Sequence, residues 1–159
     1  MMDQRSPQFI AKGISAADTR VLRHTILWPH RPHASDCTID VDEAPHAFHV
    51  GAFDVEGRHV GVCSLFEQRS ERFPHALPTD DPVYRLRVMG TLPAVRGQGA
   101  GATIIAFARE WCQNRGAHWL WCDAREVAFP FYQRVGFDFC SDHYEIDPIG
   151  THRMMVMKL

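Results

Sequence analysis

Apolar and polar positions alternate along the chain in a way that predicts a series of strands and helices. Period-two alternation or short apolar runs, both typical of strands, occur at 8–13, 46–53, 59–67, 84–89, 118–123, 137–141 and 152–159. Apolar residues at helical spacing predict helices that end before Pro29, at Arg115 and at Arg134. The resulting order, β-α-β-β-β-α-β-α-β-β, indicates an α/β fold around a mixed sheet.

Local signals set the boundaries of these elements. Ser15 suits the N-cap of the first helix, and Asp18 lies near the positive end of that helix's dipole. The segment 54–57 is expected to join two strands as a hairpin turn, and Pro130 must lie in the first turn of its helix. The first helix is expected to turn its apolar side chains toward the core: Val21, Leu22, Ile26 and Leu27.

The composition is that of an ordinary globular protein. The chain has 159 residues, of which 45% are hydrophobic and 23% charged, and its net charge is −2. This length suits a single domain over residues 1–159. The charge gives no electrostatic basis for a nucleic-acid or membrane partner, and the apolar runs are too short to span a bilayer. We therefore expect a cytoplasmic protein, and the sequence leaves open whether it forms a homodimer.

The cysteines and paired histidines do not form a metal or disulfide pattern. The five cysteines form no CxxC pair, and their number is odd. Four of them lie beside apolar residues, so we expect buried, reduced thiols: Cys37, Cys63, Cys112, Cys122 and Cys140. His46 and His49 are three residues apart on a predicted strand, so their side chains would point to opposite faces. We therefore expect no metal site.

A glycine-rich loop, Arg96-Gly97-Gln98-Gly99-Ala100-Gly101, separates a predicted strand from a predicted helix. Glycines let the backbone approach a ligand closely, and free N–H groups at a helix N-terminus attract anions. Arg96 adds a full positive charge. The loop indicates a phosphate or pyrophosphate site, although a turn that eases helix–sheet packing would have a similar composition.

Two familiar phosphate-binding motifs fit this loop incompletely. A Walker A loop requires a lysine, whereas Ala102-Thr103 follows the last glycine. The dinucleotide fingerprint GxGxxG/A fits Gly97, Gly99 and Ala102, and Asp123 ends the next strand, where an acid would bind ribose. However, residues 90–95 separate the strand from the first glycine, and only about 60 residues follow the loop.

A third motif accounts for more residues. The segment Thr91-x-Pro93-x-x-Arg96-Gly-x-Gly-x-Gly101 closely resembles the cofactor motif of the GNAT acetyltransferases, R/Q-x-x-G-x-G/A after a strand and a proline-containing turn. The segment AFPFYQRVGF at 128–137 is similar to that superfamily's A-x-x-L/F-Y-x-x-x-G-F/Y. The resemblance covers about 84–159, and 144–159 looks like the ElaA-like branch.

The resemblance implies an acetyl-CoA-dependent N-acetyltransferase that moves an acetyl group directly to a primary amine. It also implies a mostly antiparallel sheet flanked by helices, with a V-shaped cofactor opening between the fourth and fifth strands. Backbone groups of Met89 and Thr91 would hold the pantetheine arm, and Arg125 replaces an asparagine that often lies near it. The implied cofactor-binding residues are Met89, Gly90, Thr91, Arg96, Gly97, Gln98, Gly99, Ala100, Gly101, Ala102, Asp123 and Arg125.

The same resemblance assigns the proton-transfer residues. Tyr132 occupies the position of the family's general acid. Many relatives carry a glutamate base on the strand before the cofactor turn, where this chain has Arg85 and Arg87. The candidate bases are His152, His49, Asp123 and Glu145, or a chain of water molecules. His152 is the first choice, because the ElaA-like resemblance includes it.

The acceptor and the activity itself have alternatives. The loops 28–37 and 142–151, which line the acceptor side in this superfamily, mix aromatic, basic and acidic residues and therefore fit either a small-molecule or a peptide amine. Arg125 and the missing strand carboxylate favour a second hypothesis, a catalytically idle acyl-CoA-binding or sensing module. Tyr132 favours the enzyme.

Overall fold

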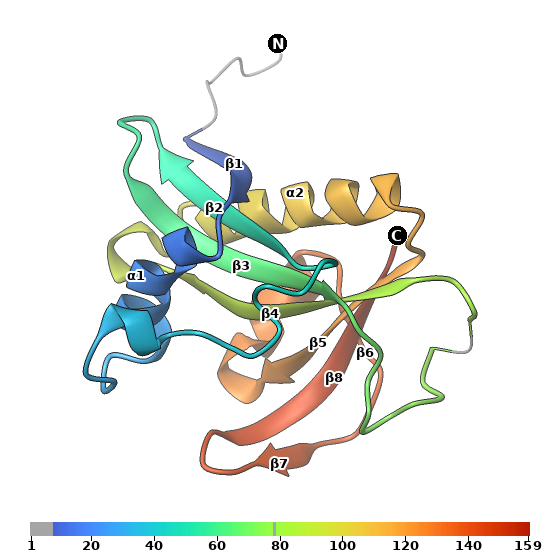
Figure 1. The fold of residues 1–159 in the computed structure, drawn as a ribbon. Coiled ribbons are helices and arrows are strands. Elements are labelled where there is room, and N and C mark those ends of the chain that lie inside the picture. The colour runs from blue at the N-terminus through green and yellow to red at the C-terminus, as the bar shows by residue number, and fades with distance from the viewer. Residues whose placement is uncertain (1–7, 78) are drawn as a thin grey trace. The chain divides into compact units, whose positions relative to one another are not determined.

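The structure is a computed structural model that describes residues 8–77 and 79–159. Figure 1 shows its strands and helices in chain order. The strands are β1 (Phe9–Ile14), β2 (Phe48–Asp54), β3 (His59–Glu67), β4 (Val83–Thr91), β5 (Trp119–Arg125), β6 (Asp138–Phe139), β7 (Tyr144–Ile146) and β8 (Gly150–Lys158). The α-helices are α1 (Arg20–Leu22), α2 (Ala100–Asn114) and α3 (Phe129–Arg134).

The strands hydrogen bond in the order β1-β2-β3-β4-β5-β8-β6, and β7 pairs with β8. β4 and β5 are parallel, whereas β1–β2, β5–β8, β6–β8 and β7–β8 are antiparallel. This confirms the predicted mixed, mostly antiparallel sheet with flanking helices. The chain divides into two compact units, residues 1–64 with 88–107 and residues 65–87 with 108–159. The prediction of a single domain over 1–159 stays a prediction.

The first unit begins with a pair of antiparallel strands. β1 pairs with β2 from Phe9 opposite Asp54 to Ile14 opposite His49, and the two lie side by side in Figure 1. The predicted hairpin turn is confirmed, since the Gly57 N–H donates to the Asp54 carbonyl at 3.0 Å and Gly57 has a φ of 82°. β2 begins two residues later than predicted, because His46 lies in the turn that precedes it.

The first helical segment is more irregular than predicted. A 3-10 turn (Ala17–Thr19), α1 and a π-helical turn (Arg23–Leu27) follow one another. Ser15 caps the segment as expected, since its Oγ accepts the Asp18 N–H at 3.1 Å. The expected inward position of Val21 is wrong, because its side chain is 63% exposed. Arg23, two residues further on, is fully buried instead.

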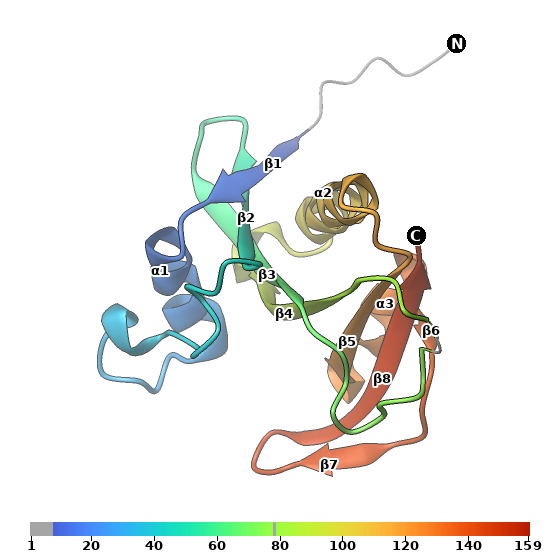
Figure 2. The same cartoon turned by 45° about the vertical axis from the view of Figure 1, so that its right-hand side comes forward.

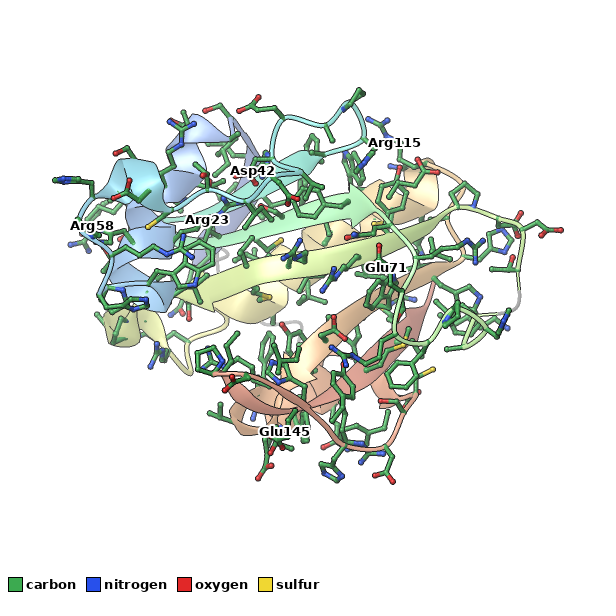
Figure 3. The ribbon with its side chains drawn as sticks, turned by 60° about the horizontal axis from the view of Figure 1, so that its bottom comes forward. Arg23, Asp42, Arg58, Glu71, Arg115 and Glu145 are labelled. Carbon is green, nitrogen blue, oxygen red and sulfur yellow. The ribbon has the colours of Figure 1, made fainter. Side chains whose placement is uncertain are left out.

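Arg23 is buried in the first unit with both terminal nitrogens of its guanidinium on acceptors, whereas its Nε has no hydrogen-bond partner among the described residues. Nη1 and Nη2 donate to the Asp42 carboxylate at 2.7 and 2.8 Å, and Figure 3 shows the two side chains together. Nη1 also donates to the Cys37 carbonyl, and Nη2 to Ser64 Oγ. His49 extends the network to Ser64 Oγ at 2.7 Å and to the Asp42 carbonyl at 3.0 Å. Buried charges persist only when paired in this way.

The second unit is built around β5 and β8. β5 pairs with β8 along its whole length, from Trp119 opposite Lys158 to Arg125 opposite His152. β4 runs parallel to β5 over the pairs that begin at Val83 opposite Trp119. A core cluster of buried side chains lies in this unit: Leu77, Val83, Trp121 and Met154. The end of α2 is where the sequence predicts it, since Gly116 has a φ of 76° and the following Ala117 N–H donates to the Cys112 carbonyl.

A short strand that the sequence analysis missed joins β8 in this unit. β7 pairs with β8 from Tyr144 opposite His152 to Ile146 opposite Gly150, and Figure 2 shows the two strands as a hairpin. The predicted strand at 137–141 is reduced to β6. β7 escaped prediction because three residues are too few to show a period, and because the turn residues Asp147 and Pro148 follow directly.

Candidate active site

The last residues of β4 have an unusual backbone. Val88 has a φ of 48°, a left-handed conformation that costs a β-branched residue on the order of 1–3 kcal/mol. Gly90 packs so closely that an added Cβ would lie 2.6 Å from Ile26 Cγ2. The Leu92 N–H then donates to the Val60 carbonyl at 2.8 Å, which ties the strand end to β3. Met89 and Thr91, the predicted pantetheine contacts, are thus held on a fixed, half-buried stretch of backbone.

The glycine loop follows in the same unit and opens α2. Gly97 and Gly99 have φ values of 78° and 99°, so the loop conformation itself favours glycine at both positions. Apart from each glycine and its two chain neighbours, no heavy atom of the described residues lies within 4 Å of where a side chain at either position would begin. The loop therefore presents open space beside its backbone, as a ligand cradle requires.

The start of α2 supplies donors beside that space. Both the N–H and the hydroxyl of Thr103 donate hydrogen bonds to the Gly99 carbonyl, at 3.0 and 2.9 Å. The N–H groups of Ala100, Gly101 and Ala102 belong to the first turn, where an α-helix offers them no internal acceptor. That turn consists of small, uncharged residues. Its amides and the helix dipole together form a site suited to an anion.

Two side chains of the loop have different roles. Gln98 folds back, and its Nε2 donates to the Ala94 carbonyl at 3.0 Å, so this side chain braces the turn. Arg96 is exposed to solvent. The residues of the loop that fit a pyrophosphate are therefore the backbone from Gly97 to Ala102 and the Arg96 guanidinium.

Tyr132 lies in the second unit on α3, whose first turn contains Pro130 as predicted. Its side chain is buried, and its ring contacts Phe131 and Phe137 edge-on at 5.2 Å between centroids. Gly136, at a φ of 107°, ends the helix, and the Phe137 N–H donates to the Tyr132 carbonyl at 2.9 Å. The helix is therefore short and firmly attached, and the ring has a defined position.

Asp123, also in the second unit, holds two partners. Its Oδ2 accepts a hydrogen bond from Arg85 Nη2 at 2.6 Å, and its Oδ1 accepts one from the Tyr144 hydroxyl. Burial and this bond to a carboxylate raise the pKa of the Tyr144 phenol, so it stays protonated and donates. Because both carboxylate oxygens are engaged, Asp123 is better suited to anchoring its neighbours than to removing a proton.

Arg85 stands where many relatives carry an acid, and its surroundings explain why a cation is stable there. Besides Asp123, its Nη1 donates to Gln68 Oε1 at 3.2 Å, and its guanidinium lies 4.8 Å from the Trp121 ring. The Trp121 Nε1 in turn donates to the Gln68 carbonyl at 2.7 Å. The strand position is thus part of a neutral ion pair and is not a vacant base.

His152 has the geometry of a proton acceptor. Its Nδ1 lies 2.7 Å from the Gly150 carbonyl oxygen, which can only accept, so Nδ1 carries a proton and Nε2 is the ring nitrogen left to act as an acceptor. The ring is almost fully buried and stacks on Tyr144 with 6.1 Å between centroids and 21° between planes. With its proton on Nδ1, the ring is oriented as a general base that works through Nε2 would need.

The other candidate bases are placed less favourably. His49 uses both ring nitrogens in the Arg23–Asp42 network of the first unit. Glu145 is exposed and accepts the Thr151 hydroxyl at 2.6 Å. Because neighbours on a strand alternate in direction, it points away from the face that carries Tyr144. Arg125, opposite His152 in the β5–β8 pairing, is exposed.

The predicted site residues fall into two groups. Met89, Gly90, Thr91 and the loop 96–102 lie in the first unit, and Asp123, Arg125, Tyr132 and His152 lie in the second. The V-shaped opening and the individual residue roles stay predictions. The sequence did not predict the contacts of Tyr144 with Asp123 and His152, because its only signal was an aromatic side chain in the C-terminal segment.

The described residues contain neither a metal-binding cluster nor a membrane-spanning helix. Within residues 8–77 and 79–159, no group of three or more His, Cys, Asp or Glu side chains is arranged to hold a metal ion. Over the same ranges, no helix has the length and apolar character needed to cross a membrane.

Comparison with known proteins identifies the family. Residues 15–137 match the acetyltransferase (GNAT) family. The chain is 34% identical over 148 residues to YitI of Bacillus subtilis (strain 168), an N-acetyltransferase described as uncharacterized, and the match covers 93% of this chain and 95% of YitI. The protein therefore belongs to the GNAT acetyltransferases, and its general activity is that of an N-acetyltransferase.

Solved structures confirm the fold. Escherichia coli ElaA has a TM-score of 0.68 at 16% identity, over 94% of this chain and 99% of ElaA. FeeM, an N-acyl amino acid synthase from uncultured soil microbes, has a TM-score of 0.69 at 14% identity, over 96% of this chain and 92% of FeeM. The predicted resemblance to GNAT proteins, with ElaA among the similar structures, is thus confirmed.

Proposed function

We propose that the protein transfers an acetyl group directly from acetyl-CoA to a primary amine. The observation that carries this proposal is the glycine loop, whose backbone amides open α2 beside free space at Gly97 and Gly99. The loop and Arg96 would bind the pyrophosphate, and backbone groups from Met89 to Thr91 would hold the pantetheine arm. Bound acetyl-CoA supplies an acetyl group activated as a thioester.

The residues of the second unit would move the protons. His152 Nε2 takes a proton from the acceptor ammonium, which gives a neutral amine with a lone pair. That lone pair forms the C–N bond to the acetyl carbonyl carbon, and a backbone N–H near Met89 stabilises the oxyanion. The C–S bond then breaks, the Tyr132 hydroxyl protonates the departing thiolate, and the amide nitrogen loses its second proton to solvent. Solvent exchange returns His152 and Tyr132 to their starting forms.

The acceptor is a small-molecule or peptide amine in this proposal. FeeM is an N-acyl amino acid synthase, and this supports an amine-bearing acceptor in general terms. The occurrence of Arg85 in place of a strand carboxylate, together with the exposed Arg125, supports the alternative that the chain is a catalytically idle acyl-CoA-binding or sensing module.

Two measurements test the proposal. In the first, thermal unfolding is followed with CoA and with NAD, because a ligand that binds only the folded state raises the melting temperature. A higher melting temperature with CoA supports the assignment of the loop to CoA binding. A higher melting temperature with NAD alone would instead identify the loop as a dinucleotide-binding motif. In the second, a panel of amines is incubated with acetyl-CoA while thiol release is followed. CoA binding without turnover on any amine would favour the idle module.

A further inference from the structure

Four groups of the second unit surround one side chain, Tyr144. The Arg72 guanidinium lies over the phenol ring at 4.4 Å from its centroid, and Phe73 meets the ring edge-on at 5.4 Å. The ring stacks on the His152 imidazole at 6.1 Å, and the hydroxyl donates to Asp123. Tyr144 thus contacts a cation, an aromatic ring, a carboxylate and the imidazole of His152.

These contacts fix the ring at both ends. The hydroxyl donates a hydrogen bond to Asp123. The other carboxylate oxygen of Asp123 is bound by Arg85 at 2.6 Å, so the position of the Asp123 side chain is also fixed. The ring body contacts both the Arg72 guanidinium and the His152 imidazole, through a cation–π contact and a stacked pair that favour defined geometries. A phenol bound in this way has little freedom to rotate.

His152 takes its orientation from the same hairpin. Its Nδ1 donates to the Gly150 carbonyl, at the end of the turn that joins β7 to β8, and its ring rests on Tyr144, directly opposite in the β7–β8 pairing. The first contact sets which nitrogen is protonated. The second sets the plane of the imidazole, and hence the direction of the Nε2 lone pair.

We propose that Tyr144 is a positioning residue that holds the His152 imidazole in the plane required for proton removal from the acceptor amine. The proposal rests on the role given to His152 above. Tyr144 touches neither reactant in this account: its ring orients the base, and its hydroxyl holds the ring on Asp123.

The test is a double-mutant cycle measured by thiol release from acetyl-CoA with an amine that the panel identifies. Tyr144→Leu removes the stacking ring, and Tyr144→Phe keeps it. Each is made in the natural sequence and in the His152→Ala background. We expect Tyr144→Leu to lower kcat about tenfold or more, with the KM for acetyl-CoA little changed, and Tyr144→Phe to recover most of the loss. In the His152→Ala background, Tyr144→Leu should cause no further loss, because coupled residues are not additive.

The outcomes separate the inference from the function. Equal losses from Tyr144→Leu in both backgrounds, or unchanged kcat in the natural background, would overturn the positioning role while acetyl transfer stands. A natural protein that binds CoA and releases no thiol with any amine would overturn the proposed function instead. Tyr144→Met, with a flexible apolar side chain, serves as a second variant if Tyr144→Leu fails to fold, and CoA calorimetry confirms that each variant is folded.

Discussion

Arg23 and Asp42 form a bidentate ion pair, with nitrogen–oxygen distances of 2.7 and 2.8 Å, in which Arg23 is fully buried. The pair joins the π-helical turn Arg23–Leu27 to the segment before β2. The same turn carries Ile26, which packs against Gly90 on the predicted pantetheine strand. We therefore expect loss of one partner of this pair to destabilise the first unit more than loss of an exposed charge.

We expect Arg23→Met to lower the free energy of unfolding by about 3–5 kcal/mol, because it leaves a buried carboxylate without its partner. Arg58→Met is the matched control. Arg58 also pairs with an aspartate, Asp54, but its side chain is 73% exposed, so water screens the pair and little change is expected. Urea unfolding of both variants measures the difference. Equal losses would show that burial of the Arg23 pair is not what stabilises it.

The Asp42 carboxyl also predicts a dependence of stability on acid. Burial raises its pKa, but hydrogen bonds from Arg23 and the Ile39 N–H outweigh burial, and the net pKa is lowered. The stabilisation from Asp42 is therefore complete above its unfolded pKa of about 3.9 and is lost as the pH falls through the lower folded value. In urea unfolding between pH 6 and pH 3, we expect the gap between the natural protein and Asp42→Asn to narrow below about pH 4. A constant gap would contradict this assignment.

Replacement of Gly99 should separate ligand binding from folding. Gly99→Val places a branched side chain in the open space beside the loop and forces a valine into a positive φ. Gly57→Val, in the β2–β3 hairpin, imposes the same kind of backbone strain at a φ of 82°, also with open space around it. We expect similar losses of stability, on the order of 1–3 kcal/mol, in both variants. Calorimetry should show lost CoA binding only in Gly99→Val; natural affinity in that variant would remove the loop from the cofactor site.

The Tyr132 hydroxyl is the group whose removal tests general acid catalysis. Tyr132→Phe keeps the edge-on contacts with Phe131 and Phe137, so packing and CoA affinity should change little. We expect kcat to fall on the order of 100-fold, the usual effect of a lost general acid. Tyr84→Phe is the control, because Tyr84 is also buried and meets Trp111 edge-on at 5.3 Å. Turnover that is equal in the two variants would remove Tyr132 from the mechanism.

The order of elements was readable from the sequence because most strands and helices are long enough to show a period. β3 occupies the predicted 59–67, and the proline and glycine signals at Pro130, Gly116 and Gly136 mark the expected helix ends. The first helix was less accessible. Val21 is exposed, whereas Arg23, the first residue of the π-helical turn, is buried. The periodicity of apolar residues cannot predict that an arginine is buried.

The candidate site also has one part that could be predicted from the sequence and another that could not. The loop 96–101 was predictable because glycine is selected by backbone conformation, and the positive φ values at Gly97 and Gly99 follow from that selection. The surroundings of Asp123 were not predictable, because Arg85, Tyr144 and Asp123 come from three strands and meet only through tertiary pairing. The choice among candidate bases likewise needed hydrogen-bond partners, which single-sequence spacing does not supply.

The buried thiols have a practical consequence for any assay that follows free CoA with a thiol reagent. Such reagents react with thiolates. Burial raises the pKa of Cys112 to about 12 and also raises the pKa of Cys122. Cys37 and Cys63 are buried as well, which leaves Cys140 as the most accessible sulfur of the five. A Cys140→Ser protein should therefore give a quiet baseline, against which slow turnover on a poor acceptor becomes visible.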